Sequence, residues 1–350
     1  MLGSSIGLGA GGGGRLQAEL IHLIQSYLGN PLLDRLEDGS VLDPADPASQ
    51  LVFTTDSYVV HPMQFPGGDV GSLAVCGTVN DLAVMGAVPR YLSLAFIIEE
   101  GLKLSEFEQI LTSIAQRAVE AEVQIITGDT KVVERHKGDK LFINTAGIGF
   151  KSLQRDYGMH RLAPGQSLVV NGTLGDHSIA VMLSREGMNF EADVQSDCAP
   201  LSGLVEALLA AVGENHVYAM RDLTRGGLAA VLNEYAQRAS IDIHVSEDAL
   251  PITRPVRAAT RVLGFEPVVL ANEGKLVAVI DEAAVDKALA AMRDHPYGRE
   301  AVKIGHLGDR FDPQKPPQDR PRRPLVLFHT AAGGLRVVDM PVGELLPRIC

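Results

Sequence analysis

Five aspartates stand beside glycines or other small residues, at positions where elements are expected to begin or end. They are Asp38, Asp56, Asp81, Asp129 and Asp222. Carboxylate oxygens without accompanying histidines suit Mg²⁺, which commonly bridges protein carboxylates to nucleotide phosphates. Each aspartate taken alone is better explained by helix capping or turn formation. The set as a whole favours a magnesium-dependent nucleotide site, although the spacing by itself does not prove one.

A glycine-rich segment, residues 3–14, precedes the first expected helix and includes Gly11 and Gly12. Residues 7–12 satisfy G-x-G-x-x-G, but a dinucleotide-binding fold needs a strand before this motif and no apolar run precedes it. The backbone N–H groups of such a loop can cover phosphates without obstruction by side chains. A terminus without fixed structure is the simpler alternative. No G-x-x-x-x-G-K-[ST] motif occurs, so a P-loop is excluded.

Two polar residues beside tight turns could act on a phosphorylated substrate. Lys131, in Asp-Thr-Lys, is a candidate phosphate partner, and Glu273, in Asn-Glu-Gly, is a candidate general base. A surface ion pair or a turn is the simpler explanation of each residue in isolation. His177 follows Gly-Asp, and this pattern is also explained by a helix N-cap and a solvent-facing histidine.

The last residue of the sequence is Cys350, which closes the segment Pro-Arg-Ile-Cys. Prenylation needs a cysteine four residues from the end, so this motif does not fit it. Ten extended residues span at most about 35 Å, which lets residues 341–350 move between a surface and an internal pocket. The α-carboxylate of Cys350 disfavours the thiolate form of its side chain, and the positive charge of Arg348 offsets this only in part. We therefore expect a carrier thiol that a partner enzyme loads, rather than a redox sensor.

Alternating strands and helices must position these residues in the first half of the chain. Apolar residues at helical spacing predict a helix over 16–28. The further expected elements are strands over 51–55, 58–61, 91–98, 123–127 and 141–150, and helices over 69–88 and 105–121. The small residues of 69–88 predict a helix that packs close to another backbone. Ser105 and Glu108 have the spacing of a capping box.

The second half begins near residue 162 and repeats the alternation. The expected elements are strands over 167–171, 241–245, 276–280, 325–328 and 335–338, and helices over 201–212, 227–238 and 283–292. Interleaved strands and helices predict an α/β layer. We therefore divide the chain into an N-terminal domain, residues 1–160, a C-terminal α/β domain, residues 161–310, and a segment of linker, short strands and tail, residues 311–350.

Composition excludes several classes of function. A net charge of -12 argues against a nucleic-acid partner, because phosphate backbones require clustered Lys and Arg. No apolar run approaches the roughly 20 residues of a membrane-spanning helix, and no signal peptide is recognisable. The three cysteines, Cys76, Cys198 and Cys350, have no regular spacing and suit a reducing compartment. We therefore expect a cytoplasmic protein that does not bind membranes.

Several motifs follow one another along the chain in a recognisable order. They are residues 54–62, 65–69, 76–86, 127–134, 171–177, 221–227, 271–275 and the closing Pro-Arg-Ile-Cys. Together they resemble the HypE family of hydrogenase maturation factors, within the PurM-like superfamily of aminoimidazole ribonucleotide (AIR) synthetase. The closing motif is the most specific, because related ATP-dependent enzymes lack it. One departure is Leu8, where the family usually has a histidine before Gly-Ala-Gly-Gly.

The resemblance implies a two-domain PurM-like fold, with an α+β N-terminal domain that contributes to a β-barrel across a homodimer and a C-terminal α/β domain. It implies that ATP and Mg²⁺ bind between the domains. It further implies that a carbamoyltransferase, HypF, loads a carbamoyl group onto Cys350. The chain then dehydrates this group to a thiocyanate with ATP and passes cyanide to a HypC–HypD complex, for the iron of [NiFe] hydrogenase.

The resemblance also suggests a role for each candidate residue. Asp38, Asp81 and Asp222 would hold magnesium, and Cys350, Lys131 and Glu273 would be catalytic. The nucleotide contacts would be Gly11, Gly12, Asp56, Asn80, Asp129, Thr130 and His177. Two alternatives remain: another ATP-dependent enzyme on this scaffold, such as a selenophosphate synthetase or AIR synthetase, and a maturation scaffold without turnover.

Overall fold

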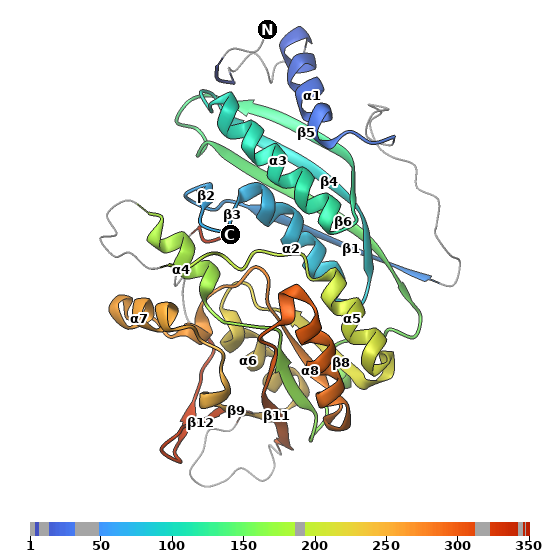
Figure 1. The fold of residues 1–350 in the computed structure, drawn as a ribbon, viewed down its shortest axis with the longest axis vertical. Coiled ribbons are helices and arrows are strands. Elements are labelled where there is room, and N and C mark those ends of the chain that lie inside the picture. Colours follow the sequence, from blue (N-terminus) through green and yellow to red (C-terminus); the bar gives the residue numbers. More distant parts are fainter. Residues whose placement is uncertain are drawn as a thin grey trace.

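The computed structural model describes residues 4–6, 14–31, 49–185, 193–311, 323–341, 346 and 348–350. Its elements form two halves, each built on a sheet, which lie one above the other in Figure 1. The predicted site residues Gly11, Gly12 and Asp38 lie outside the described residues. Within the described ranges, no helix combines the length and the apolar character needed to cross a membrane.

The N-terminal half is built on a four-stranded sheet with the order β1-β6-β4-β5. Its elements are α1 (Gly14–Leu28), β1 (Ser49–Tyr58), β2 (Gln64–Phe65), β3 (Gly68–Asp69), α2 (Val70–Val84), β4 (Val88–Glu99), α3 (Leu104–Glu120), β5 (Gln124–Val133) and β6 (Leu141–Ser152). β4 pairs parallel with β5, and the other neighbours in this sheet pair antiparallel. Helices α2 and α3 cover one face of the sheet (Figure 1).

The other face of this sheet is open. In β4, Leu94 and Phe96 are buried, whereas Ile97 is 44% exposed. Successive side chains of a strand point to opposite faces, so the buried set marks the helix-covered face. On the open side, Leu51 and Phe53 of β1 are 58% and 62% exposed. The N-terminal half therefore presents an apolar sheet face without cover in this chain.

Helix α2 lies at the centre of the N-terminal half and is buried on nearly all sides. Small residues let neighbours approach its axis. A Cβ at Gly77 would lie 2.3 Å from the Oη of Tyr58, and one at Gly71 would lie 2.8 Å from the backbone oxygen of Ile110. The prediction of close packing for this segment is confirmed. The packing fixes the last turns of α2, which carry Asp81, against β1 and the second half.

The C-terminal half is built on a seven-stranded sheet with the order β13-β12-β9-β11-β7-β10-β8. Its elements are β7 (Ser167–Val170), α4 (Asp176–Leu183), α5 (Ser202–Val212), β8 (Val217–Asp222), α6 (Gly227–Ala239), β9 (Ile241–Ser246), α7 (Arg254–Leu263), β10 (Leu276–Ile280), α8 (Val285–Asp294), β11 (Val302–Arg310), β12 (Val326–His329) and β13 (Leu335–Val337). Strands and helices interleave as predicted. Most neighbouring strands in this sheet pair antiparallel, and β9 and β12 pair parallel.

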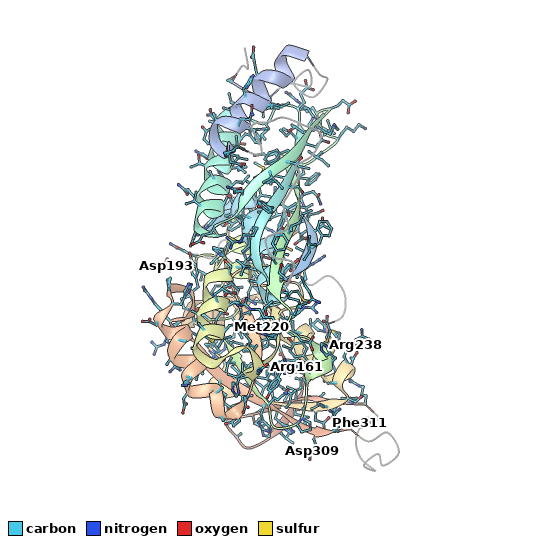
Figure 2. All side chains as sticks on the ribbon, turned by 90° about the vertical axis from the view of Figure 1, so that its right-hand side faces the viewer. Arg161, Asp193, Met220, Arg238, Asp309 and Phe311 are labelled. Atoms are coloured by element: carbon cyan, nitrogen blue, oxygen red, sulfur yellow. The ribbon has the colours of Figure 1, made fainter. Side chains whose placement is uncertain are left out.

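Strand β10 explains why the second half is well packed. Val277 and Val279 face the core that contains α6, whereas Ala278 and Ile280 face the core that contains α5 and α8. A strand covered on both faces must be apolar throughout, which accounts for the unbroken apolar run of 276–280. Figure 2 shows Met220 of β8 inside this half, with Asp309 of β11 near its far end.

Three details differ from the predictions. The strands expected over 51–55 and 58–61 are one strand, β1, which ends at Tyr58. The strand expected over 123–127 continues to Val133, because β4 pairs with it along its whole length. The capping box predicted at Ser105 is wrong: α3 has Lys103 as its N-cap without a side-chain hydrogen bond. The capping box in this half belongs to α2, between Asp69 and Ser72.

Candidate active site

A cavity of about 880 Å³ lies between the two halves. Residues of β1, α2 and β8, the loop that follows β8, and the end of the chain line it. The cavity brings together five of the predicted site residues: Asp56, Asp81, Asp222, Glu273 and Cys350. The sequence therefore predicted a set of residues that the fold assembles from positions far apart in the chain.

The end of the chain is docked beside the segment that follows β1. The Val59 N–H donates to the carbonyl oxygen of Cys350 at 3.2 Å, and the His61 N–H donates to that of Arg348 at 3.1 Å. The Arg348 side chain also donates from Nε to the oxygen of Val59 at 3.0 Å and forms an ion pair with Asp139. These bonds hold residues 348–350 in one place.

The Cys350 thiol lies inside the cavity in a setting that keeps it protonated. Burial raises the pKa of Cys350 well above its usual range, and the nearby charge of Glu273 raises it further. Arg225 opposes these effects only in part. Since the thiolate is the nucleophilic form of cysteine, Cys350 is a poor nucleophile in this position. The geometry suits a thiol that carries a group better than one that attacks.

Glu273 is 3% exposed, and within the described part of the chain its Oε1 has no hydrogen-bond partner. Burial raises the pKa of Glu273 well above its ordinary value, with a further contribution from Cys198. The backbone fixes its place: the Glu273 N–H donates to Asp197 Oδ1 at 3.0 Å, and a Cβ at Gly274 would lie 1.9 Å from the oxygen of Asp197. A carboxylate in such a setting is a stronger base than an ordinary glutamate.

Asn80 supports Glu273 from behind rather than lining the cavity. Its Nδ2 donates to the carbonyl oxygens of Ala199 and Glu273, both at 3.1 Å, and its Oδ1 accepts the N–H of Leu201 at 2.7 Å. Both amide protons and the oxygen are therefore engaged by the protein. In the structure Asn80 is a buried residue that supports the Glu273 backbone, whereas the family resemblance suggested a nucleotide contact.

Three further carboxylates line the cavity. Thr54 Oγ1 donates to Asp81 Oδ2 at 2.9 Å, and burial raises the pKa of Asp81. Burial, together with the charge of Asp81, raises the pKa of Asp222 to about 7. Asp56 is the third carboxylate of the lining. A bound cation would relieve the repulsion among these acidic groups.

These carboxylates fit Mg²⁺ as a partner of phosphate rather than a metal held by protein alone. No three metal-binding side chains of the described residues converge closely enough to hold an ion by themselves. Mg²⁺ typically keeps several waters and needs only one or two carboxylates, with phosphates completing its shell. The oxygen donors of Asp56, Asp81 and Asp222 match that requirement.

Asp129, Thr130 and Lys131 lie on strand β5, away from the cavity lining. Lys131 is paired with Asp129 at 3.0 Å, and both side chains are more than half exposed. Asp129 and Lys131 are registered with Ala95 and Ile97, so they point to the open face of the sheet. Thr130 is registered with Phe96 and is 7% exposed, so its side chain points to the helix-covered face. None of these three residues lines the cavity of its own chain, as far as the structure describes it.

His177, at the start of α4, contacts the docked tail instead of the cavity. Its Nε2 donates to the carbonyl oxygen of Ile349 at 2.8 Å, and its Nδ1 lies 2.8 Å from Ser196 Oγ. Both ring nitrogens therefore have protein partners. Sequence reasoning also left Arg221 and Arg225 unassigned, although both line the cavity. The only signal for them was their position on either side of Asp222-Leu-Thr.

Two family models match the chain. The N-terminal domain of AIR synthase related proteins matches residues 36–150, and the C-terminal domain of the same proteins matches residues 163–314. A carbamoyl dehydratase HypE of Bradyrhizobium diazoefficiens is 46% identical over 347 residues, which cover 99% of this chain and 96% of the relative.

Solved structures agree with these matches. A hydrogenase maturation protein HypE in complex with ATP superposes with a TM-score of 0.90 at 43% identity, covering 98% of this chain and 99% of that one. A chain of a HypE–HypF complex superposes with a TM-score of 0.77 at 39% identity, covering 94% and 100%. The fold, the order of the motifs and similarity over nearly the full length agree, and the chain belongs to the HypE family of hydrogenase maturation proteins.

Proposed function

We propose that this chain is a carbamoyl dehydratase that converts a carbamoyl group on Cys350 into a thiocyanate at the expense of ATP. The observation that carries the proposal is the docked Cys350 thiol, which shares one cavity with a carboxyl oxygen of Glu273 that has no hydrogen-bond partner among the residues described. A relative of known structure binds ATP, and relatives bear the name carbamoyl dehydratase.

The proposed reaction explains why the cavity needs both the Cys350–Glu273 pair and the three aspartates. The carbamoyl oxygen is a poor leaving group, and phosphoryl transfer from ATP turns it into phosphate, a good one. Loss of phosphate requires that protons leave the carbamoyl nitrogen, and Glu273 is the base placed to accept one. Glu273 is 3% exposed and Cys350 is partly buried, so the cavity shields the activated group in part from water, which would otherwise hydrolyse it.

We place the nucleotide in the cavity, whose volume of about 880 Å³ is in the range of ligand-binding pockets. Asp56, Asp81 and Asp222 would hold Mg²⁺, which supplies positive charge to the phosphates. Asp38 would complete this set, and Gly11 and Gly12 would cover the phosphates with backbone N–H groups.

We propose that the protein acts as a homodimer joined through the open sheet face. Leu51, Phe53 and Ile97 are the exposed large apolar side chains of that face. Contiguous apolar surface of this kind marks an interface in soluble proteins. Because Asp129 and Lys131 point to this open face and do not line the cavity of their own chain, their proposed contacts with nucleotide would be made across this interface.

The state of Cys350 supports loading by a partner. A protonated, buried thiol does not attack a carbamoyl donor, so we propose that the tail leaves the cavity to be loaded by HypF. A relative forms a complex with HypF. The thiocyanate would then pass to a HypC–HypD complex. The free thiols Cys76, Cys198 and Cys350 suit the cytoplasm, where we place these steps.

Intact-mass spectrometry tests the proposal. Protein incubated with HypF, a carbamoyl donor and ATP should gain the mass of a carbamoyl group on the peptide that ends in Cys350. With ATP and Mg²⁺ that peptide should then lose the mass of one water. A Cys350→Ala variant should show neither change. Loading at another residue, or water loss without ATP, would contradict the proposed function.

A further inference from the structure

His177 is buried and contacts the docked tail. Its side chain is fully buried, and its ring stands edge-on to that of Phe65, with 5.4 Å between the centroids. Its Nε2 meets the carbonyl oxygen of Ile349, and its Nδ1 meets Ser196 Oγ. The residue that His177 contacts is therefore the immediate neighbour of Cys350.

The partners determine which ring nitrogen carries the proton. A carbonyl oxygen only accepts, so Nε2 must donate to Ile349. Ser196 Oγ already accepts the N–H of Cys198 at 3.1 Å, which leaves its hydroxyl proton to point at Nδ1. Burial lowers the pKa of His177, so the neutral ring is the form that fits. Hydrogen bonds thus run in one direction, from Cys198 through Ser196 and His177 to the tail.

Ser196 is itself a fixed anchor. Its N–H donates to the oxygen of Pro66 at 2.7 Å. A Cβ at Gly67 would lie 2.7 Å from both the nitrogen and the oxygen of Ser196, so the turn between β2 and β3 fits tightly against it. Through Ser196, His177 therefore ties the tail to the tight contact between the two halves at Pro66 and Gly67.

We propose that His177 is a positioning residue that orients Cys350, and with it the carried group, toward Glu273; this inference rests on the proposed function. A peptide group is planar, so fixing the carbonyl oxygen of Ile349 also fixes the nitrogen and Cα of Cys350. On its other side, the carbonyl oxygen of Cys350 accepts the N–H of Val59. The two bonds together leave little freedom to the residue between them.

The test uses two measurements on His177→Phe, which keeps a ring against Phe65 but loses the donor. The first is the rate at which iodoacetamide alkylates Cys350 in unmodified protein without ATP, followed by peptide mass mapping. Losing one hydrogen bond should populate the undocked tail and raise this rate roughly three- to tenfold. The second is the single-turnover rate of water loss at varied ATP, which should fall while the KM for ATP stays unchanged.

Matched variants separate positioning from general damage. His177→Gln retains an N–H donor near the position of Nε2 and should restore both rates. His216→Phe makes the same change at a histidine that pairs with Asp281 instead, and it should alter neither rate. Ser196→Ala should accelerate alkylation less than His177→Phe does. The double variant should match His177→Phe, because both residues act in one chain of hydrogen bonds.

Unchanged alkylation in His177→Phe overturns the proposal, and a raised KM for ATP in that variant would return His177 to the nucleotide. If His177→Phe does not fold, Ser196→Ala and His177→Gln decide: unchanged alkylation in Ser196→Ala counts against the proposal. Alkylation requires neither ATP nor a carbamoyl group. If His177→Phe is alkylated faster but neither it nor the wild type converts the carbamoyl group with loss of water, His177 docks the tail and the proposed reaction is rejected.

Discussion

Two groups of residues in the cavity lining differ in composition. The reaction pair, Cys350 and Glu273, joins a thiol and a carboxyl group, and burial favours the uncharged form of each. The carboxylate set, Asp56, Asp81 and Asp222, places three acidic side chains in the same lining, and the charge of Asp81 adds to burial in raising the pKa of Asp222. This difference indicates a division of roles within one cavity: the reaction pair suits proton transfer to and from a carried group, and the carboxylate set suits a metal-bridged nucleotide.

Removing the base of the reaction pair should have the largest effect. Glu273→Gln keeps the size of the side chain but cannot accept a proton, so the rate of water loss should fall by about 10²- to 10⁴-fold. ATP affinity should not change, because the carboxylate set is untouched. Single-turnover mass spectrometry and nucleotide binding measure the two quantities. Equal losses in both would contradict the division of roles between the two groups.

Removing the Asn80 side chain, which supports Glu273, should have the second largest effect. Asn80→Ala would leave the buried Leu201 N–H and the oxygens of Ala199 and Glu273 without their partner. We expect the free energy of unfolding to fall by about 3 kcal/mol, measured by urea titration. The rate of water loss should fall more than the affinity for ATP. A weaker affinity for ATP with unchanged stability would instead support a nucleotide contact for Asn80.

The carboxylate set should destabilise the nucleotide-free protein as pH rises. The pKa of Asp222 is about 7 in the folded chain and about 3.9 in an unfolded one. Between these values the folded state keeps a proton that the unfolded state has lost. The free energy of unfolding therefore falls with rising pH, by up to about 1.4 kcal/mol per unit from this group.

Asp222→Asn should remove that slope. The variant should be as stable as the wild type near pH 4 and increasingly more stable toward pH 7, in the absence of metal and nucleotide. Urea unfolding at several pH values measures this difference. Parallel stability profiles would show that the carboxylates do not repel one another in the way the cavity implies.

The ion pair of the tail should have the smallest effect. Asp139 and Arg348 are about one-third exposed, at 32% and 37%, and pairs of this kind contribute below about 1 kcal/mol. Asp139→Asn should accelerate alkylation of Cys350 about twofold, and less in high salt. Asp156→Asn, which removes an exposed partner of His160, is the control. If Asp139→Asn accelerates alkylation more than His177→Phe does, Arg348 rather than His177 is the main residue that holds the tail.

Elements with a strong apolar pattern could be predicted from the sequence, and the others could not. The run of β10 and the helix α5 were found because both are rich in apolar residues. Helix α7 was missed because most of its residues are polar or exposed. Strand β11 was missed because it contains Gly305, where the oxygen of His244 on the next strand lies 2.0 Å from the place of a Cβ. Only the fold shows that close approach.

Some residues of the candidate site could likewise be predicted from the sequence, and others could not. Motifs pointed to Glu273 and Cys350, whose types carry the chemistry whatever their surroundings. The places of Asn80 and His177 depend on partners 119 or more residues away, including the tail. A local pattern shows that such a residue is polar and near a glycine, but it cannot show which group the side chain meets. The same limit applies to Lys131, whose face of the sheet follows from strand pairing.

In the proposed reaction, ATP activates the carbamoyl oxygen while Cys350 holds the group in the cavity. An isotope experiment tests this step: Cys350 is loaded with a carbamoyl group that carries a heavy oxygen isotope, ATP and Mg²⁺ are added, and the mass of the released inorganic phosphate is determined. We expect the isotope to appear in that phosphate. Recovery of the isotope in water, or its retention on the protein after the nucleotide has been hydrolysed, would contradict it.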